Sequence, residues 1–252
     1  MAAGRAEAHV GFILPDAFHY TECGPVGAVA TFSDAFPAPE VALRSDAFAF
    51  IAPSGERLSF ASVQSDHAIT RLVATLEAPG NYRLTSGVRY GRTGRVAVTE
   101  DGFQRLDAAG NLESASSSNP AVLTSRAVTV SETSISCGAR TEDSRERTAG
   151  RLTIRPLSDH MAGVSQLFEI RYDNGLRPVD EIRFVSAYGS ETENLAETLN
   201  ANAVLDLGLL TPGPYTLLVR HIAHAPADAD VALYSYSTAL TFEIRAAEPQ
   251  PD

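Results

Sequence analysis

Short runs of apolar or alternating residues, separated by turn residues, recur along the whole chain. Runs of this length and pattern are typical of β-strands. They cover residues 27–32, 47–52, 58–63, 68–76 and 95–99 in the first half, and 151–155, 165–172, 181–187, 204–207, 215–222 and 239–245 in the second. Only Glu191–Asn200 favours a helix of more than two turns. The pattern predicts an all-β protein with antiparallel pairing, because the helical crossovers typical of parallel strands are missing.

A Pro-Gly turn followed by a tyrosine occurs twice, 133 residues apart. Residues 78–84 read APGNYRL and residues 211–217 read TPGPYTL. Each copy predicts a tight turn that leads into a strand with an aromatic residue at its entrance. In immunoglobulin-like sandwiches, a tyrosine near the start of a late strand ties that strand to a neighbouring turn through its hydroxyl. The repeat therefore predicts two related antiparallel β-sandwich domains in tandem, of the immunoglobulin or transthyretin type.

Composition suggests where these domains begin and end. Residues 108–120 have the composition of an exposed polar loop, and residues 141–148 that of a charged connector. We expect an N-terminal sandwich with a connecting strand over residues 9–138, a linker over 139–150 and a C-terminal sandwich over 151–246. Residues 247–252 have the composition of a disordered tail.

The charged residues exclude several classes of chemistry. The chain has 20 arginines, no lysine and 31 acidic residues, which gives a formal charge of −11. The lack of lysine excludes Schiff-base catalysis, a phosphate-loop lysine and a Ser-Lys nucleophile. An acidic chain without a basic cluster argues against sequence-independent binding of nucleic acid. No apolar run reaches the roughly 18–20 residues of a membrane helix. The known nucleophile, zinc-protease and phosphate-loop motifs are also missing, so we expect no enzymatic activity.

Two features favour an exported protein. Ala6-Glu7-Ala8 has the small-x-small form of a signal-peptidase site, although a frayed alanine-rich tail would read the same way. A bond between Cys23 and Cys137 would close a loop of more than 100 residues, worth about 4–5 kcal/mol in the chain-entropy model. Two unrelated buried thiols are the other interpretation. We expect a periplasmic or otherwise exported location.

Histidines near the N-terminus are candidate metal ligands. His9 follows the Ala-x-Ala sequence directly, and His19 and Asp16 lie close behind it. Neutral imidazole suits zinc, copper, nickel and iron, and carboxylates or a terminal amine complete such shells. Cleavage before His9 would leave its amine and imidazole as a bidentate chelate for Cu(II) or Ni(II). The alternative is a solvent-facing His9 on an N-terminal strand.

A second group of candidate ligands follows the second Pro-Gly-x-Tyr turn. His221 and His224 are three residues apart, so in an extended strand their rings point to opposite faces. They converge only if the strand ends near Ile222 and the chain then bends; otherwise they are exposed loop histidines. Asp228 and Asp230 would then add two carboxylates. The predicted metal ligands are His9, His19, His221, His224, Asp16, Asp228 and Asp230.

Several short segments resemble a family of periplasmic proteins. They are Ala8–Pro15 (AHVGFILP), Ser33–Pro37 with Pro53–Gly55, the Pro-Gly-x-Tyr turn, Asn174–Val179 and Tyr234–Ile244. They are similar to nickel/cobalt-uptake components, a family that also includes domains of unknown function. The resemblance implies an exported protein with two transthyretin- or immunoglobulin-like domains and a part in transition-metal handling. The tryptophan and lysine often found near the end of that family's first domain have no counterpart in this chain.

We therefore expect an exported, non-catalytic protein that binds or relays Ni, Co, Cu, Zn or Fe in the cell envelope and assists metal uptake, with a transporter or receptor as partner. Its affinity for metal should fall below about pH 6, because imidazole must be neutral to bind. The alternative is a non-catalytic interaction module that presents edge strands and loops to an envelope protein. A hydrolase or carbohydrate-active domain is a third hypothesis, and it requires convergent carboxylates or a nucleophile in a cleft.

Overall fold

The computed structural model of the chain describes residues 9–99, 102–106, 121–139, 146, 148–173, 175, 179–187, 195 and 199–247. Its strands are β1 (Val10–Pro15), β2 (His19–Tyr20), β3 (Pro25–Ser33), β4 (Val41–Ala42), β5 (Ala49–Ile51), β6 (Arg57–Leu58), β7 (Ser62–Ser65), β8 (Thr70–Thr75), β9 (Gly80–Thr85), β10 (Arg89–Thr99), β11 (Gly102–Arg105), β12 (Ala121–Cys137), β13 (Leu152–Pro156), β14 (Ser165–Tyr172), β15 (Glu181–Ser186), β16 (Val204–Leu209), β17 (Gly213–His224) and β18 (Leu233–Ile244). All regular elements among these residues are strands, which confirms the all-β prediction. Accordingly, this part of the chain contains no helix of the length and hydrophobicity that a membrane crossing requires.

Several predicted features fall outside the described residues. They are the Ala6–Ala8 cleavage site, the loop at 108–120, almost all of the connector at 141–148, most of the helix at 191–200 and the tail from residue 248 onward.

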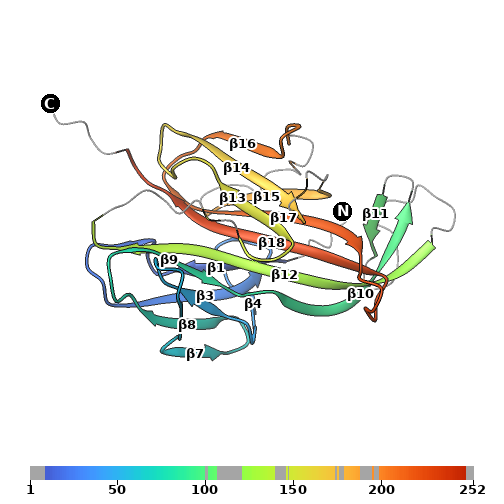
Figure 1. The fold of residues 1–252 in the computed structure, drawn as a ribbon, viewed down its shortest axis with the longest axis horizontal. Helices are drawn as coiled ribbons and strands as arrows, with labels where there is room; N and C mark the ends of the chain where they lie inside the picture. The colour runs from blue at the N-terminus through green and yellow to red at the C-terminus, as the bar shows by residue number, and fades with distance from the viewer. Residues whose placement is uncertain are drawn as a thin grey trace, which may run out of the picture.

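The strands form three sheets that stack as three layers (Figure 1). A ten-stranded sheet lies in the middle, with the order β15-β17-β18-β12-β9-β5-β6 and with β2, β10 and β11 attached through β12. A five-stranded sheet of β1, β3, β4, β7 and β8 packs on one face, and the three-stranded sheet β13-β14-β16 packs on the other. The five-stranded sheet closes one sandwich with β5, β9 and β12, and its strand β1 also packs on β15, β17 and β18. The three-stranded sheet closes the second sandwich on the opposite face, which confirms the predicted sandwich architecture.

Alternation along the strands places the two cores on opposite faces of the central sheet. Ile135 on β12 points into the N-terminal core, with Tyr82 and Leu84 of β9. Leu240 and Phe242 on β18 point into the C-terminal core. Successive side chains of a strand leave the sheet on opposite faces, so neighbouring strands can serve different cores.

The two halves of the central sheet meet through a parallel pair, which corrects the prediction of purely antiparallel pairing. β12 runs parallel to β18 from the pair Ser125 and Leu233 to the pair Thr133 and Thr241, and it also runs parallel to β2. The sequence pattern argued against this arrangement because crossover helices are missing from it. The chain between β12 and β18 includes the other strands of the C-terminal sandwich, and this whole unit serves as the crossover.

The repeated Pro-Gly-x-Tyr turns form two equivalent corners, as predicted. The Tyr82 hydroxyl donates to the Ala78 carbonyl at 2.8 Å and accepts from the amides of Glu77 and Ala78. The Tyr215 hydroxyl donates to the Thr211 carbonyl at 2.8 Å and contacts the Thr211 hydroxyl at 2.9 Å. Each tyrosine also stacks on a phenylalanine of the adjacent strand, with 10° between the ring planes in both cases.

Cys23 and Cys137 form a disulfide, which decides between the two interpretations that the sequence left open. The bond joins the end of β12 to the segment before β3, across a sequence separation of 114 residues. It therefore encloses nearly all of the N-terminal sandwich in one covalent loop.

We predict that the double substitution Cys23→Ser, Cys137→Ser lowers the free energy of unfolding by about 4 kcal/mol, because a loop of this length is no longer closed in the unfolded chain. Urea denaturation measures this change. Dithiothreitol should lower the stability of the parent to that of the double variant and leave the variant unaffected. An equally stable parent with and without the reductant would show that the bond does not form.

The corner tyrosines provide a matched comparison. Tyr82→Phe leaves the Glu77 and Ala78 amides without their acceptor, whereas Tyr215→Phe mainly removes contacts to one residue, Thr211. The Tyr82 hydroxyl makes three hydrogen bonds and the Tyr215 hydroxyl two, so Tyr82→Phe removes more of them. We expect Tyr82→Phe to destabilise by about 2–3 kcal/mol and Tyr215→Phe by about 1 kcal/mol in urea denaturation. The reverse order would contradict the assignment.

Candidate metal centre

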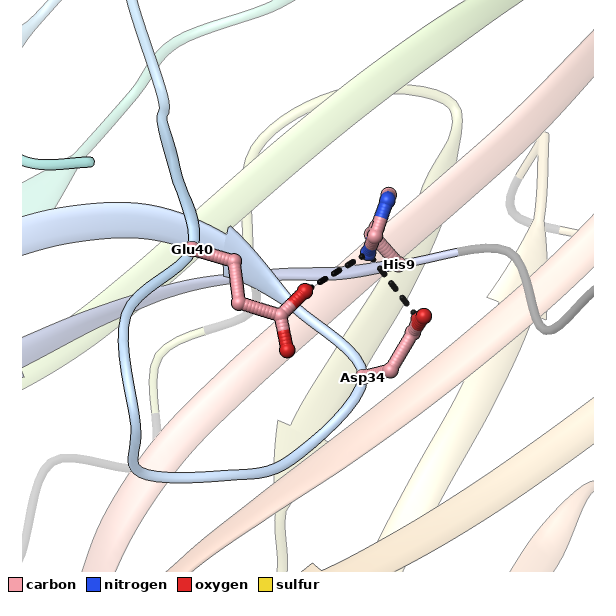
Figure 2. Close-up of side chains that lie close together, drawn as sticks. All are labelled: His9, Asp34 and Glu40. Atoms are coloured by element: carbon pink, nitrogen blue, oxygen red, sulfur yellow. Dashed lines mark ion pairs between the residues drawn. The ribbon is translucent and has the colours of Figure 1, made fainter. Parts of the chain in front are cut away.

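One histidine and two carboxylates meet at the open end of the β1–β3 hairpin (Figure 2). His9 directly precedes β1 and Asp34 directly follows β3, and antiparallel pairing of Val10 with Ser33 brings the two residues together. The chain then turns back, with the Ser33 hydroxyl accepting from the Ala35 amide at 2.9 Å. The turn delivers Glu40 to the same place, at the start of β4.

The three side chains contact one another through a single imidazole nitrogen. His9 Nδ1 lies 3.0 Å from Asp34 Oδ1 and 3.3 Å from Glu40 Oε2. All three groups are exposed, and their nearest ligand atoms lie within 4.8 Å of one another. In the part of the chain that the structure describes, this is the one group of three such side chains within that range.

These distances match those between adjacent ligands of a metal ion. With bonds of about 2.1 Å, neighbouring ligands are separated by about 3.0 Å in an octahedron and about 3.4 Å in a tetrahedron. One imidazole nitrogen and two carboxylate oxygens suit zinc and other divalent transition metals. A protonated imidazole between two carboxylates gives similar distances, so a proton and a metal ion would compete for the same nitrogen.

The other N-terminal candidates lie at the opposite end of β1. His19 is on β2, where its Nδ1 is 2.9 Å from the Ser136 hydroxyl. Asp16 follows β1 and its carboxylate fills the space beside Gly27, where a Cβ atom would lie 2.3 Å from Asp16 Oδ2. The structure therefore separates His9 from His19 and Asp16 by the length of a strand.

His221 and His224 could converge only if their strand ended near Ile222, and the structure does not meet this condition. β17 continues to His224 instead of ending near Ile222, so the two rings project to opposite faces. The His221 ring lies 4.6 Å from that of Tyr172, and the His224 ring lies 6.1 Å from that of Phe103. His221 also has Asp180 at 3.3 Å from its Nδ1.

The two aspartates of this group lie in the loop after β17 and do not join the histidines. Asp230 pairs with Arg126 Nη2 at 2.6 Å, and Asp228 is exposed in the same loop. Through β18, His221 aligns with Val128 of β12, whereas His19 aligns with Ser136. Val128 and Ser136 are eight residues apart on β12, which corresponds to about 26 Å along the strand. His221 and His19 are therefore far apart, and the four histidines do not form one site.

Asp34 and Glu40 were missed because they lie 25 and 31 positions after His9 in the sequence. Only pairing of the first two long strands brings Asp34 beside His9. A usable signal was present: if residues 10–15 and 27–32 form a hairpin, the residue before the first strand lies beside the residue after the second. Asp34 is also part of the Ser33–Pro37 segment of the family resemblance.

Comparisons with known proteins show no family for this chain. No family model and no curated protein matches the chain. Among solved structures, the fibronectin(III)-like modules of Clostridium thermocellum CbhA are 14% identical, with 96% of this chain and 99% of theirs covered and a TM-score of 0.20. The amphioxus IgVJ-C2 molecule is 11% identical, with 90% and 99% covered and a TM-score of 0.21. An I-band fragment of titin is 12% identical, with 96% and 67% covered and a TM-score of 0.21.

A second group of titratable side chains lines a pocket of about 70 Å³ between the two sandwiches. Glu132 of β12 lies at this pocket with a 1% exposed side chain, accepting from the Ala149 amide at 3.0 Å. Arg83 Nη1 lies 3.9 Å from Glu132 and 3.4 Å from Glu146. Burial raises the pKa of the Glu132 carboxyl above its ordinary value of 4.5, and this effect outweighs the opposing attraction of Arg83.

Because the folded state raises the pKa of Glu132, its contribution to stability falls as the pH rises above about 4.5. Glutamine stays neutral at every pH, so the stability of Glu132→Gln relative to the parent should increase from pH 4.5 to pH 7.5. Urea denaturation at the two pH values measures this difference, and Glu56→Gln, at an exposed position, controls for the lost charge. A relative stability that is constant or decreases with pH would contradict the raised pKa.

Proposed function

We propose that this protein binds a divalent transition-metal ion through His9, Asp34 and Glu40 and holds or relays that ion without catalysing a reaction. The observation that carries the proposal is the approach of two carboxylates, at 3.0 and 3.3 Å, to one imidazole nitrogen. These three side chains supply half of an octahedral shell or three positions of a tetrahedral one. Water or a donor from another molecule completes it.

The position of the site supports binding with ready exchange. Antiparallel pairing holds His9 against Asp34, so two of the three ligands are oriented before a metal arrives. All three side chains are between about a third and a half exposed, which leaves a path for entry and release. The net charge of −11 raises the local concentration of cations around the molecule.

An exported location and a role in metal uptake are part of the proposal. The Cys23–Cys137 disulfide is the kind of bond that persists in oxidising compartments such as the periplasm. His9 also lies within the segment that resembles nickel/cobalt-uptake components. A protein that binds a metal reversibly at an exposed site could pass it to an envelope transporter or receptor.

Equilibrium dialysis of the full chain against Zn(II), Ni(II), Co(II) or Cu(II), followed by elemental analysis, tests the proposal. We expect one tightly held equivalent of at least one metal at pH 7.5 and at least tenfold weaker binding in His9→Ala, Asp34→Asn and Glu40→Gln. Binding should also weaken as the pH falls from 7 to 5, because protons compete for the imidazole. His224→Ala is the matched control, since it removes an exposed histidine that lies outside the group.

Equal affinity in the parent and in all three site variants would contradict the site. If no metal is retained by any of them, the alternative of a non-catalytic interaction module takes its place. A chain that starts at His9 distinguishes a further possibility. Tighter binding of Cu(II) or Ni(II) by that chain than by the chain beginning at Met1 would mean that the free amine joins the imidazole as a ligand.

A further inference from the structure

Part of the central sheet extends beyond both sandwiches. We call this part the arm; it consists of β10, β11 and residues 121–129 of β12 (Figure 1). Seven large hydrophobic side chains of the described residues are exposed, and three of them, Tyr90, Val98 and Val122, are on the arm. A fourth, Val88, directly precedes β10. Four of the seven exposed apolar side chains thus lie on or directly beside the arm, next to Val96 and Ala97 of β10, which are buried.

Strand register places two of these side chains, Tyr90 and Val122, on one face of the sheet, and Val98 on the other. Tyr90 is opposite Val128 and Val122 is opposite Ala97, while Arg126 is beside Tyr234 of β18. Directly opposite residues of paired strands project to the same side. We call this side the arm face; it carries Tyr90, Arg95, Val122, Arg126 and Tyr234, together with Ala97, which is buried.

The arm face continues the surface that the three-stranded outer sheet covers farther along. Val128, next to the arm face, is 4% exposed and belongs to the C-terminal core. The rings of Tyr90 and Tyr234 are 5.9 Å apart, and a further 5.9 Å separates Tyr234 from the buried Tyr236. The exposed ring of Tyr90 is therefore supported by the partly buried ring of Tyr234 and, through it, by the core, and rigid aromatic side chains lose little entropy when a partner binds.

The arm is also locally cationic in an acidic protein. Residues 89–95 contain three arginines and no acidic residue. Arg92, at the irregularity in the β10–β12 pairing, and Arg95, on the arm face, are both exposed. Arg126 is held in place by its ion pair with Asp230. This charge favours an anionic partner, which most of the acidic chain would repel.

The arrangement of the rings indicates which kind of anionic partner fits. The ring planes of Tyr90 and Tyr234 meet at 61°, so they do not form one flat platform for a sugar ring. Tyrosine and arginine are enriched in the cores of protein interfaces, where they receive apolar side chains and carboxylates. We propose that the arm face binds an acidic, extended segment of a partner protein, with Tyr90 and Tyr234 as apolar anchors and Arg92 and Arg95 as contacts to carboxylates.

A random copolymer of glutamate and tyrosine, labelled with a fluorophore, is a suitable probe for the full chain. Anisotropy titrations in EDTA keep the proposed metal site out of the measurement. We expect the parent to bind the copolymer more tightly than polyglutamate, and Tyr90→Ala, Tyr234→Ala and Arg95→Ala to weaken binding at least fivefold. Arg71→Ala, an exposed arginine of β8, removes the same charge away from the arm and should leave binding unchanged. Thermal unfolding checks that each variant is folded.

Three results would overturn the proposal. The first is no saturable binding of the copolymer at low salt. The second is equal loss of binding in Arg71→Ala and Arg95→Ala, which would indicate attraction to charge anywhere on the surface. The third is binding of alginate, an acidic polysaccharide, as tightly as the copolymer and without dependence on Tyr90 or Tyr234. That result would identify a site for anionic glycans instead of protein segments.

Discussion

The parallel pairing of β12 with β18 is the contact on which the rest of the structure depends. It runs through nine residue pairs and turns two separate half-sheets into one central sheet. At its end, the Thr133 hydroxyl donates to the Thr241 carbonyl across the junction. Because Glu132 and Leu240 face one side while Ser131 and Ala239 face the other, each strand contributes to both layers. The two sandwiches can therefore share a sheet and still have separate cores.

The same junction determines where the candidate sites lie. β1 packs across it, with the Gly11 carbonyl accepting from the Ser131 hydroxyl at 2.8 Å and Phe12 in a cluster with Ala239. The group of His9, Asp34 and Glu40, at the start of β1, is thus anchored to the central layer. The arm exists because β12 is 17 residues long: residues 121–129 pair with β10, and the first four of them extend past the residues that pair with β9 and β18. One long strand therefore positions a buried carboxylate, a disulfide and the arm face.

The fold class and the tyrosine corners could be predicted from the sequence because they depend on local patterns. Alternation in β14 and the Pro-Gly turns before Tyr82 and Tyr215 are visible within a few residues. The parallel junction could not be predicted from the sequence, because its register depends on packing between strands far apart in the chain. For the same reason, only one of the three residues of the candidate metal site was predicted. His9 stood out by residue type, whereas Asp34 and Glu40 become ligand candidates only through strand pairing.

The parallel junction also has a consequence for how the chain is made. β18 is the last of the described strands. The ribosome therefore synthesises the other strands of the C-terminal sandwich before β12 can pair with β18. During that time, the middle of β12 presents unpaired amides and carbonyls along one edge, a template for strands of other molecules. A fragment cut after the disulfide would keep this open edge permanently. The two sandwiches are therefore interdependent on the ribosome and in truncated proteins, even though each has a core of its own.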